Sequence, residues 1–372
     1  WIERGAVDPR DEAQPANLVD QEAAADFWAY QQPARVPIPA ASPADRSWCR
    51  STIDRFVLEN LNQHDLRPSK DAEPETLLRR LHFDLIGLPP TPDDIDKFIL
   101  SVQTHGLDIA IAACVDQLLH SAAYGERWGR HWLDVARYAE SSGKEANISF
   151  PYAWRYRDYV IDAINADVPF DRLVIEQIAG DLLAAKDDTE RTRLLIATGF
   201  LALGPKNLDA ANPRQFEADL IDEQIDAVTR VFMASSVACA RCHDHKFDPF
   251  SMEDYYGLAG IFASTKTYFG TAVSPSNRVG GDPLVLPKLA STLILHRSIS
   301  PKKVESLRAE KVAMQKEKAE KGAAFTLRDA LRIFWRTGAI DGQLEKVDAR
   351  GKALPLAMGV LDDSNVRDSP LM

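Results

Sequence analysis

Two cysteines and a histidine stand close together in the segment Cys239-Ala240-Arg241-Cys242-His243. Two thiols separated by two residues, with a histidine directly after the second thiol, form the pattern to which c-type haem is attached. In that chemistry the thiols form thioethers with the vinyl groups of the haem, and the histidine becomes an axial ligand of the iron. The pattern occurs once, so the sequence predicts one covalent haem c at Cys239, Cys242 and His243.

Two other interpretations of this motif stay open. A zinc ion accepts four nitrogen and sulfur ligands, and Cys239, Cys242, His243 and His245 supply such a set. Structural zinc sites usually take their second pair of ligands from further along the chain, which disfavours this alternative. A disulfide between the two cysteines, or a pair of free thiols, is the third interpretation.

The motif does not fix the ligand on the other side of the iron. His245 lies too near the motif histidine in sequence to reach the opposite face of a haem. Histidine and methionine are common axial partners, so His131 and Met252 are the leading candidates, followed by Met233 and His82. An iron with five ligands, open to peroxide or to a substrate, is the alternative.

A second stretch rich in functional side chains runs from Tyr124 to Tyr138. Tyr124, Trp128 and Trp132 recur every four residues, which predicts a helix that buries an aromatic stripe. The opposite face carries side chains that can bind an anion, a haem propionate or a substrate hydroxyl, among them Arg130, His131, Asp134 and Arg137. These four form a candidate catalytic set, and a buried hydrogen-bond network that joins helices is the alternative.

Two further segments are expected to be structural. Leu203–Asn207 is predicted to be a simple turn, because a glycine and a proline interrupt the helical pattern there. Tyr152–Tyr159 combines aromatic side chains with two arginines, and this pattern favours a helix that packs into the core with a basic rim. The alternatives are a substrate loop for the first segment, and sugar stacking or propionate pairing for the second.

The composition excludes several classes of function. The chain has 372 residues with 44 Lys and Arg against 55 Asp and Glu, and this net charge of −11 disfavours binding to nucleic acid, which is a polyanion. No run of about 18 apolar residues is present, so no membrane-spanning segment is expected. The glycine-rich phosphate-binding motifs, the G-x-S-x-G nucleophile motif and the H-E-x-x-H zinc motif are absent, which weakens the nucleotide-binding, hydrolase and zinc-protease classes.

The elements that position these residues are expected to be mainly helical. Apolar residues recur at helical spacing through 48–266, where strand-like alternation is scarce. Small and polar residues dominate 267–300, which is expected to be loop. A charged helix or helical hairpin is predicted over 301–322, followed by an amphipathic helix over 323–345. A strand is predicted from Ala353 onward, where apolar residues alternate.

Five stretches together resemble one known family. They are Arg79–Pro92, Tyr124–Tyr138, Tyr152–Tyr159, Gln177–Asp181 and Cys239–Pro249. In this order they are similar to the second cytochrome-associated domain of the planctomycete-type multidomain cytochrome c family, a domain of unknown function, over residues 48–266. The resemblance implies a mainly α, multi-helix c-type cytochrome-like domain with long loops and a helical insert.

The resemblance also implies an order of domains. Residues 1–8 resemble the tail of an upstream cytochrome c module, and residues 9–47 form a linker. Residues 48–266 are then the haem c domain, 267–350 a loop and helical insert, and 351–372 the lead-in to a C-terminal domain. On this interpretation the chain is the middle of a longer polypeptide, and the two neighbouring modules are its expected partners.

The resemblance further implies where the protein works. Haem is attached to such motifs outside the cytoplasm, so the family implies export to the periplasm or the cell surface. Members of the family look associated with sulfatase-like proteins and with the breakdown of polysaccharides. The expected function is electron transfer by one haem c, with oxidation of a polysaccharide-derived substrate as an extension. A peroxidase-like reaction, and a non-catalytic polysaccharide-binding or scaffold domain with a structural haem or zinc site, are the alternatives.

Overall fold

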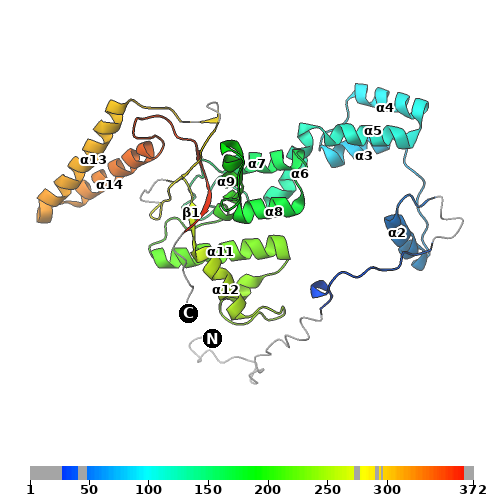
Figure 1. Ribbon diagram of the computed structural model, residues 1–372, viewed down its shortest axis with the longest axis horizontal. Helices are drawn as coiled ribbons and strands as arrows, with labels where there is room; N and C mark the ends of the chain where they lie inside the picture. The colour runs from blue at the N-terminus through cyan, green and yellow to red at the C-terminus, as the bar shows by residue number, and fades with distance from the viewer. Residues whose placement is uncertain (1–26, 41–47, 272–276, 290–292, 295, 364–372) are drawn as a thin grey trace, which may run out of the picture. The chain divides into compact units, whose positions relative to one another are not determined.

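The structure is a computed structural model, and it describes residues 27–40, 48–271, 277–289, 293–294 and 296–363. It is mainly helical, as the sequence predicts (Figure 1). The predicted tail of an upstream module, residues 1–8, lies outside the described residues. The chain divides into two compact units, of which one is Asp20–Leu118 and the other contains Leu119–Met372.

The described elements of the unit Asp20–Leu118 are helical. They are the 3-10 turn η2 (Trp28–Tyr30) and the helices α2 (Thr52–Gln63), α3 (Pro74–Leu85), α4 (Pro92–His105) and α5 (Leu107–Leu119). Helix α4 begins where Thr91 accepts a hydrogen bond from the backbone N–H of Asp94, and the Asp94 carboxylate accepts one from Thr91 in return. Helices α3, α4 and α5 share a small core of Leu78, Phe98 and Ala110.

The second unit combines helices with two short sheets. Its helices are α6 (Ala122–Val135), α7 (Trp154–Asn165), α8 (Phe170–Ala179), α9 (Asp188–Ala197), α10 (Gly199–Ala202), α11 (Pro213–Met233), η3 (Val237–Arg241), α12 (Met252–Ala263), α13 (Pro301–Lys321), η5 (Gly322–Ala324) and α14 (Leu327–Leu344). Its strands are β1 (Thr265–Tyr268), β2 (Leu284–Val285), β3 (Leu356–Ala357) and β4 (Gly359–Asp362). None of the helices in the described part of the chain has the length and hydrophobicity that a bilayer span needs.

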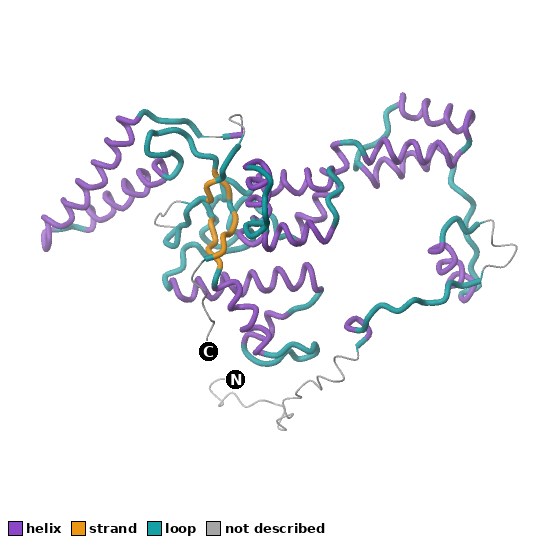
Figure 2. Tube along the Cα trace, viewed as in Figure 1, coloured by secondary structure: helices purple, strands orange, loops and turns teal. Residues whose placement is uncertain are grey.

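Both sheets are antiparallel pairs of strands (Figure 2). Strand β1 pairs with β4, so that Thr265 lies opposite Asp362, and β2 pairs with β3. The strand predicted after Ala353 is therefore confirmed, as β3 and β4. The predicted loop over 267–300 is wrong in part, because the end of β1 and the whole of β2 lie within it and pair with these late strands.

The core of the second unit lies around α7, α10 and α11. The short helix α10 is completely buried, and Phe200 contacts Phe232 of α11 with ring centroids 5.2 Å apart. Gly199 lets Tyr156 of α7 pack directly against the α10 backbone, since a Cβ atom there would lie 3.2 Å from the Tyr156 Cβ. The packing of α10 in the core therefore determines where the following turn, Leu203–Asn207, begins beside α11.

The buried face of α6 differs from the prediction. Gly125 and Gly129 face α7, and a Cβ atom at Gly125 would lie 2.5 Å from the side-chain nitrogen of Asn165. Trp132 is half-buried, whereas Trp128 is 42% exposed. The predicted aromatic stripe is wrong in part, because α6 and α7 approach so closely that only glycine fits between them.

Helices α13 and α14 lie side by side as a hairpin (Figure 1). Leu307, Met314 and Ile340 form its small core. Lys311 on one helix pairs with Asp341 on the other at 2.6 Å. The helices predicted over 301–322 and 323–345 are confirmed by this hairpin.

A buried cation joins α7 to the second sheet, and its removal is expected to destabilise the fold. Arg155 is 4% exposed, and its guanidinium donates to the carbonyl oxygens of Leu356 at 2.6 Å and Leu293 at 2.9 Å. A hydrogen bond to a charged group contributes about 1.5–3 kcal/mol. We expect Arg155→Met to lower the free energy of unfolding, measured by urea denaturation, by about 3 kcal/mol.

Arg157 on the same helix is the matched control. Its side chain is 39% exposed and pairs with Asp158 at 2.9 Å and Glu140 at 3.3 Å on the surface. Exposed ion pairs contribute little, so Arg157→Met is expected to cost less than about 1 kcal/mol. Equal losses in the two variants would contradict the role assigned to the buried guanidinium.

Candidate functional site

The cysteine motif lies on a short turn that follows α11. Helix α11 ends at Met233, and Ala234 takes a left-handed conformation (φ 52°) that turns the chain back. The turn η3 then buries Val237 and leaves Cys239 and Cys242 exposed as free thiols. Both sulfurs are therefore accessible, as the attachment of a haem requires.

His243 is exposed, and one of its ring nitrogens is already engaged. Its Nδ1 lies 2.7 Å from the carbonyl oxygen of Asp244, which can only accept, so Nδ1 carries the proton. Nε2 then carries the lone pair, and it has no hydrogen-bond partner among the described residues. Metal-ligating histidines usually donate their other N–H to a carbonyl or a carboxylate in this way. His243 therefore fits the role of an axial ligand of haem iron.

His245 is buried and has both ring nitrogens engaged. Nδ1 accepts from the backbone N–H of Asp248 at 2.8 Å and of Phe247 at 3.2 Å, and Nε2 lies 3.1 Å from the Ser236 hydroxyl. The Asp248 carboxylate is 3.5 Å from Nδ1, but an ion pair there would need a proton on a nitrogen that already accepts. His245 closes the loop after the motif, and the predicted zinc set would have to break these bonds to use it.

The described residues contain no group of three or more His, Cys, Asp and Glu side chains arranged to hold a metal ion.

The motif is held against its neighbours by Arg241, which lies between the two cysteines. The guanidinium of Arg241 lies 3.4 Å from the carboxylates of Asp219 and Asp222 of α11. The backbone carbonyl oxygen of Arg241 accepts a hydrogen bond from the Tyr256 hydroxyl at 3.2 Å. Tyr255 donates to Asp222 at 2.7 Å. These contacts fix the motif against α11 and α12.

The predicted catalytic set does not come together in the structure. Arg130, His131 and Asp134 are exposed on α6, and the His131 ring lies 5.4 Å from the ring of Trp128. Within the described part of the chain, none of these three forms a hydrogen bond or ion pair with the cysteine motif. The fourth member, Arg137, instead forms an ion pair with Glu223 of α11 at 2.7 Å. The catalytic role of this set stays a prediction.

The predicted sixth ligands lie in different surroundings. Met252 begins α12, and its backbone N–H donates to the Asp244 carboxylate at 2.9 Å, which holds it beside the residue that follows His243. Its side chain is half-buried against the main core. His131 stays on the exposed side of α6. The choice between them stays a prediction.

Arg137 belongs to a cluster, called the buried cluster below, with Glu223, which like Arg137 is half-buried, and Lys206, which is fully buried. Arg137 lies just beyond α6 in a left-handed conformation (φ 57°), which is uncommon for any residue but glycine. Its Nε donates to Glu223 Oε1 of α11 at 2.7 Å. The Lys206 ammonium lies 3.7 Å from the other carboxylate oxygen and donates to the carbonyl oxygens of Leu203 and Gly204. The turn predicted as a simple reversal thus carries a buried lysine.

Gly204 is required by the close approach within this buried cluster. Its φ is 91°, a conformation that side chains rarely adopt. A Cβ atom there would overlap the Glu223 carboxylate and lie 3.0 Å from Arg137 Nε. The Gly-Pro-Lys sequence was the local signal of a special turn, but nothing local indicated that its lysine meets Glu223 and Arg137.

Burial makes the charges of this cluster costly. Lys206 is 3% exposed, and burial lowers its pKa to about 8, although the nearby Glu223 carboxylate acts in the opposite direction. Among the described residues, both terminal guanidinium nitrogens of Arg137 and Oε2 of Glu223 are buried without a hydrogen-bond partner. The Lys206 ammonium is too far from Oε2 to serve as one. Such perturbed groups cluster at functional sites more often than elsewhere.

A cavity of 760 Å³ lies beside the buried cluster. Lys206 and Glu223 line it, together with other residues of α11 and of the turn before that helix. Its volume is in the range of small-molecule sites, which are about 300–1,000 Å³.

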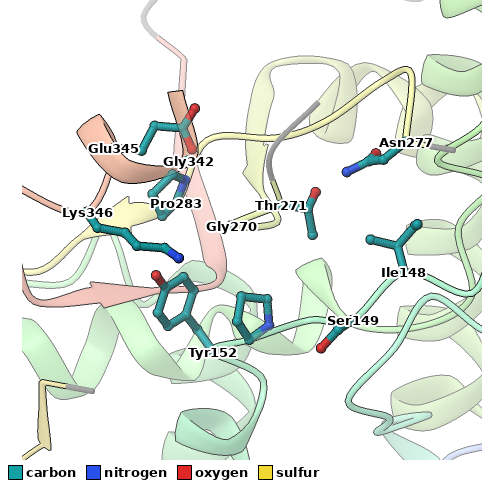
Figure 3. A pocket seen from close by; sticks show the side chains of 11 residues that line it. Ile148, Ser149, Tyr152, Gly270, Thr271, Asn277, Pro283, Gly342, Glu345 and Lys346 are labelled. Carbon is teal, nitrogen blue, oxygen red and sulfur yellow. The ribbon is translucent and has the colours of Figure 1, made fainter. Parts of the chain in front are cut away.

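A smaller cavity of 260 Å³ lies where α14 ends (Figure 3). Tyr152, Thr271 and Lys346 line it, and the Thr271 hydroxyl has no hydrogen-bond partner in the described part of the chain. No residue of the predicted site lines this cavity.

The buried ammonium predicts how stability depends on pH. The pKa of Lys206 is about 8 in the folded protein against an ordinary 10.5, so between these values the unfolded chain binds more protons. This group therefore makes the free energy of unfolding rise with pH across that window, by up to about 3 kcal/mol. The rise should be missing in Lys206→Met, so wild type should gain stability relative to the variant in urea denaturation series between these pH values.

Lys144→Met is the control, because Lys144 is exposed at the rim of the same cavity. Its unfolding free energy should follow wild type at every pH, since tyrosines titrate alike in both proteins. A difference in unfolding free energy between wild type and Lys206→Met that stays constant across this pH window would show that burial does not lower the pKa of Lys206.

The comparisons with known proteins bear on this site. No curated protein and no solved structure matches the chain. Residues 52–267 match the PSCyt2 family, which is described as a protein of unknown function (DUF1549), and the range is close to the 48–266 predicted from the resemblance. The match contains both the cysteine motif and the buried cluster. Since it covers more than half of the chain, the protein belongs to the PSCyt2 family, a planctomycete-type cytochrome-associated domain of unknown function.

Proposed function

We propose that the chain carries one haem c, bound through thioethers at Cys239 and Cys242 with His243 as an axial ligand, and that it transfers electrons. The observation that carries the proposal is the arrangement of these three side chains. Two free, exposed thiols lie on one turn, and the imidazole directly after them has its Nδ1 held by the Asp244 carbonyl and its Nε2 open. Attachment needs the first feature and ligation needs the second.

A haem held at this motif supplies one-electron oxidation and reduction at its iron. The contribution of the protein is to fix the ligand and to leave the site accessible. The hydrogen bond from Nδ1 to the backbone carbonyl of Asp244 sets the tautomer and the orientation of the His243 ring. The ion pairs of Arg241 hold the turn on α11, so little has to rearrange when the charge at the site changes. The exposed position of the motif lets an electron partner approach.

The proposed haem attachment also implies a cellular location and electron-transfer partners. Haem attachment places the protein outside the cytoplasm, in the periplasm or at the cell surface. The proposed electron partners are an upstream cytochrome c module and a C-terminal domain of the same polypeptide, with sulfatase-like proteins and polysaccharide in the wider setting. Oxidation of a polysaccharide-derived substrate and a peroxidase-like reaction are extensions that need a reacting molecule at or near the iron. The alternative is a non-catalytic domain with a structural haem or zinc site.

An absorption spectrum tests the proposal. Protein made with export and haem-attachment machinery should retain haem on a denaturing gel and give sharp bands on reduction. The double variant Cys239→Ala, Cys242→Ala should lose the covalent haem, because no thioether can form. His243→Ala should keep the covalent haem but give a different reduced spectrum, because the axial ligand is lost.

Cys114→Ala is the control, since this half-buried thiol lies on α5 of the other unit and should leave haem content and spectrum as in wild type. A colourless wild-type protein with one zinc ion per chain would overturn the proposal and favour the structural zinc site. Loss of the bands in Cys114→Ala would show that the motif alone does not hold the haem.

A further inference from the structure

Helix α14 of the helical hairpin carries large apolar side chains on a face that is open to the solvent. Leu327, Leu331, Phe334 and Trp335 stand at i, i+4, i+7 and i+8, a spacing that places them on one side of a helix. All four are exposed, and the exposed fraction is 77% for Leu327 and 58% for Trp335. The hairpin core lies on a different side of α14, where Ile340 packs against α13. The four exposed residues are called the apolar face of α14 below.

Such a face needs an explanation that single exposed residues do not. Scattered apolar side chains are normal on protein surfaces, whereas a contiguous exposed patch marks a site of interaction. The hairpin core uses the opposite part of the helix, so folding of the hairpin does not account for the apolar face. The described part of the chain leaves this face uncovered. What covers it therefore comes from outside this structure.

Arginines border the apolar face along one side. Arg328, Arg332 and Arg336 recur every four residues of α14, and all three are exposed. The acidic residues of this helix are Asp329 and Asp341, which pair with lysines of α13 at 2.9 Å and 2.6 Å. The charge that α14 presents beside its apolar face is therefore positive.

The hairpin as a whole keeps this positive excess. Two of the bordering arginines also meet glutamates of α13, Arg332 with Glu317 at 2.5 Å and Arg336 with Glu310 at 2.6 Å. Residues 301–344 nevertheless contain ten Lys and Arg against six Asp and Glu, whereas the whole chain has 44 against 55. The apolar face thus belongs to a basic hairpin in an acidic chain.

This combination of charge and shape selects among the possible occupants. A second copy of α14 would bring two rows of arginines together, and the acids of that helix are already paired. A lipid bilayer with anionic headgroups offers an apolar layer directly beneath a plane of phosphates, which suits an apolar face with a basic border. Helices that lie in a bilayer surface carry Trp, Phe and Leu on one face and Lys and Arg on the other. Trp also prefers this boundary, since its ring is apolar and its N–H is polar.

We propose that the hairpin attaches the protein to the surface of an anionic bilayer, with the apolar face of α14 below the phosphates and the arginines beside them. A helix in this position lies in the plane of the surface and does not cross the bilayer. The proposal rests on the hairpin alone and is independent of the haem.

Sedimentation of the full chain with lipid vesicles tests the occupant. Vesicles of phosphatidylcholine mixed with phosphatidylglycerol are anionic, and vesicles of phosphatidylcholine alone have no net charge. The protein should bind the mixed vesicles, and should bind the neutral vesicles about tenfold or more weakly. High salt should weaken binding to the mixed vesicles, because it screens the attraction. Absence of binding to the mixed vesicles, or equal binding to both kinds, would overturn the proposal.

A pair of tryptophan substitutions tests the place. Trp335→Ala should weaken binding to the mixed vesicles by about tenfold or more, because the indole ring is the largest side chain of the apolar face. Trp28→Ala is the control, since Trp28 is also exposed but lies outside the hairpin, and it should bind as wild type does. Circular dichroism should show the wild-type helix content in both variants, because neither ring is buried. Equal affinities of the two variants would place the contact elsewhere.

A second pair tests the charge. Arg328→Gln should reduce the preference for mixed over neutral vesicles severalfold, because Arg328 borders the apolar face. Lys70→Gln removes an exposed cation of the other unit and should leave this preference unchanged. The same preference in both variants would contradict the role of the border.

Analytical ultracentrifugation without lipid tests the competing occupant. The full chain should sediment as a monomer at micromolar concentration. A dimer that Trp335→Ala dissociates would show that a second copy covers the apolar face, and the bilayer proposal would then be wrong.

Discussion

Ion pairs along one side of α11 hold both the cysteine motif and the buried cluster in place. Asp219 and Asp222 lie one turn apart on this helix and share Arg241 of the motif. Glu223, the next residue, meets Arg137 at 2.7 Å, and a buried lysine approaches from the turn before the helix. A single helix therefore positions the exposed thiols at its end and the cavity along its length. Val237 and Ala240 of η3, which are fully buried in the main core, anchor the motif together with these ion pairs.

The buried cluster is costly for the fold, and its geometry offsets this cost only in part. Taking charges out of water costs several kcal/mol per ion, and only well-placed partners offset it. Here the hydrogen bonds are incomplete, since Glu223 Oε2, which has only the Lys206 ammonium at 3.7 Å, and two nitrogens of Arg137 have no hydrogen-bond partner among the described residues. The backbone of Arg137 is left-handed as well, at φ 57°. Backbone strain and unsatisfied polar atoms often occur together at functional sites.

Sequence reasoning succeeded where the signal is local and failed where it depends on contacts distant in sequence. The helices and the strand after Ala353 follow from short-range patterns, and the family limits follow from the resemblance that five short stretches carry. The burial of α6 does not, because the distance between α6 and α7 decides whether Gly125 or Trp128 faces inward. The direction of the Arg137 side chain depends on the left-handed φ angle of this residue. The role of His245 depends on two backbone N–H groups that only the folded loop brings to its ring.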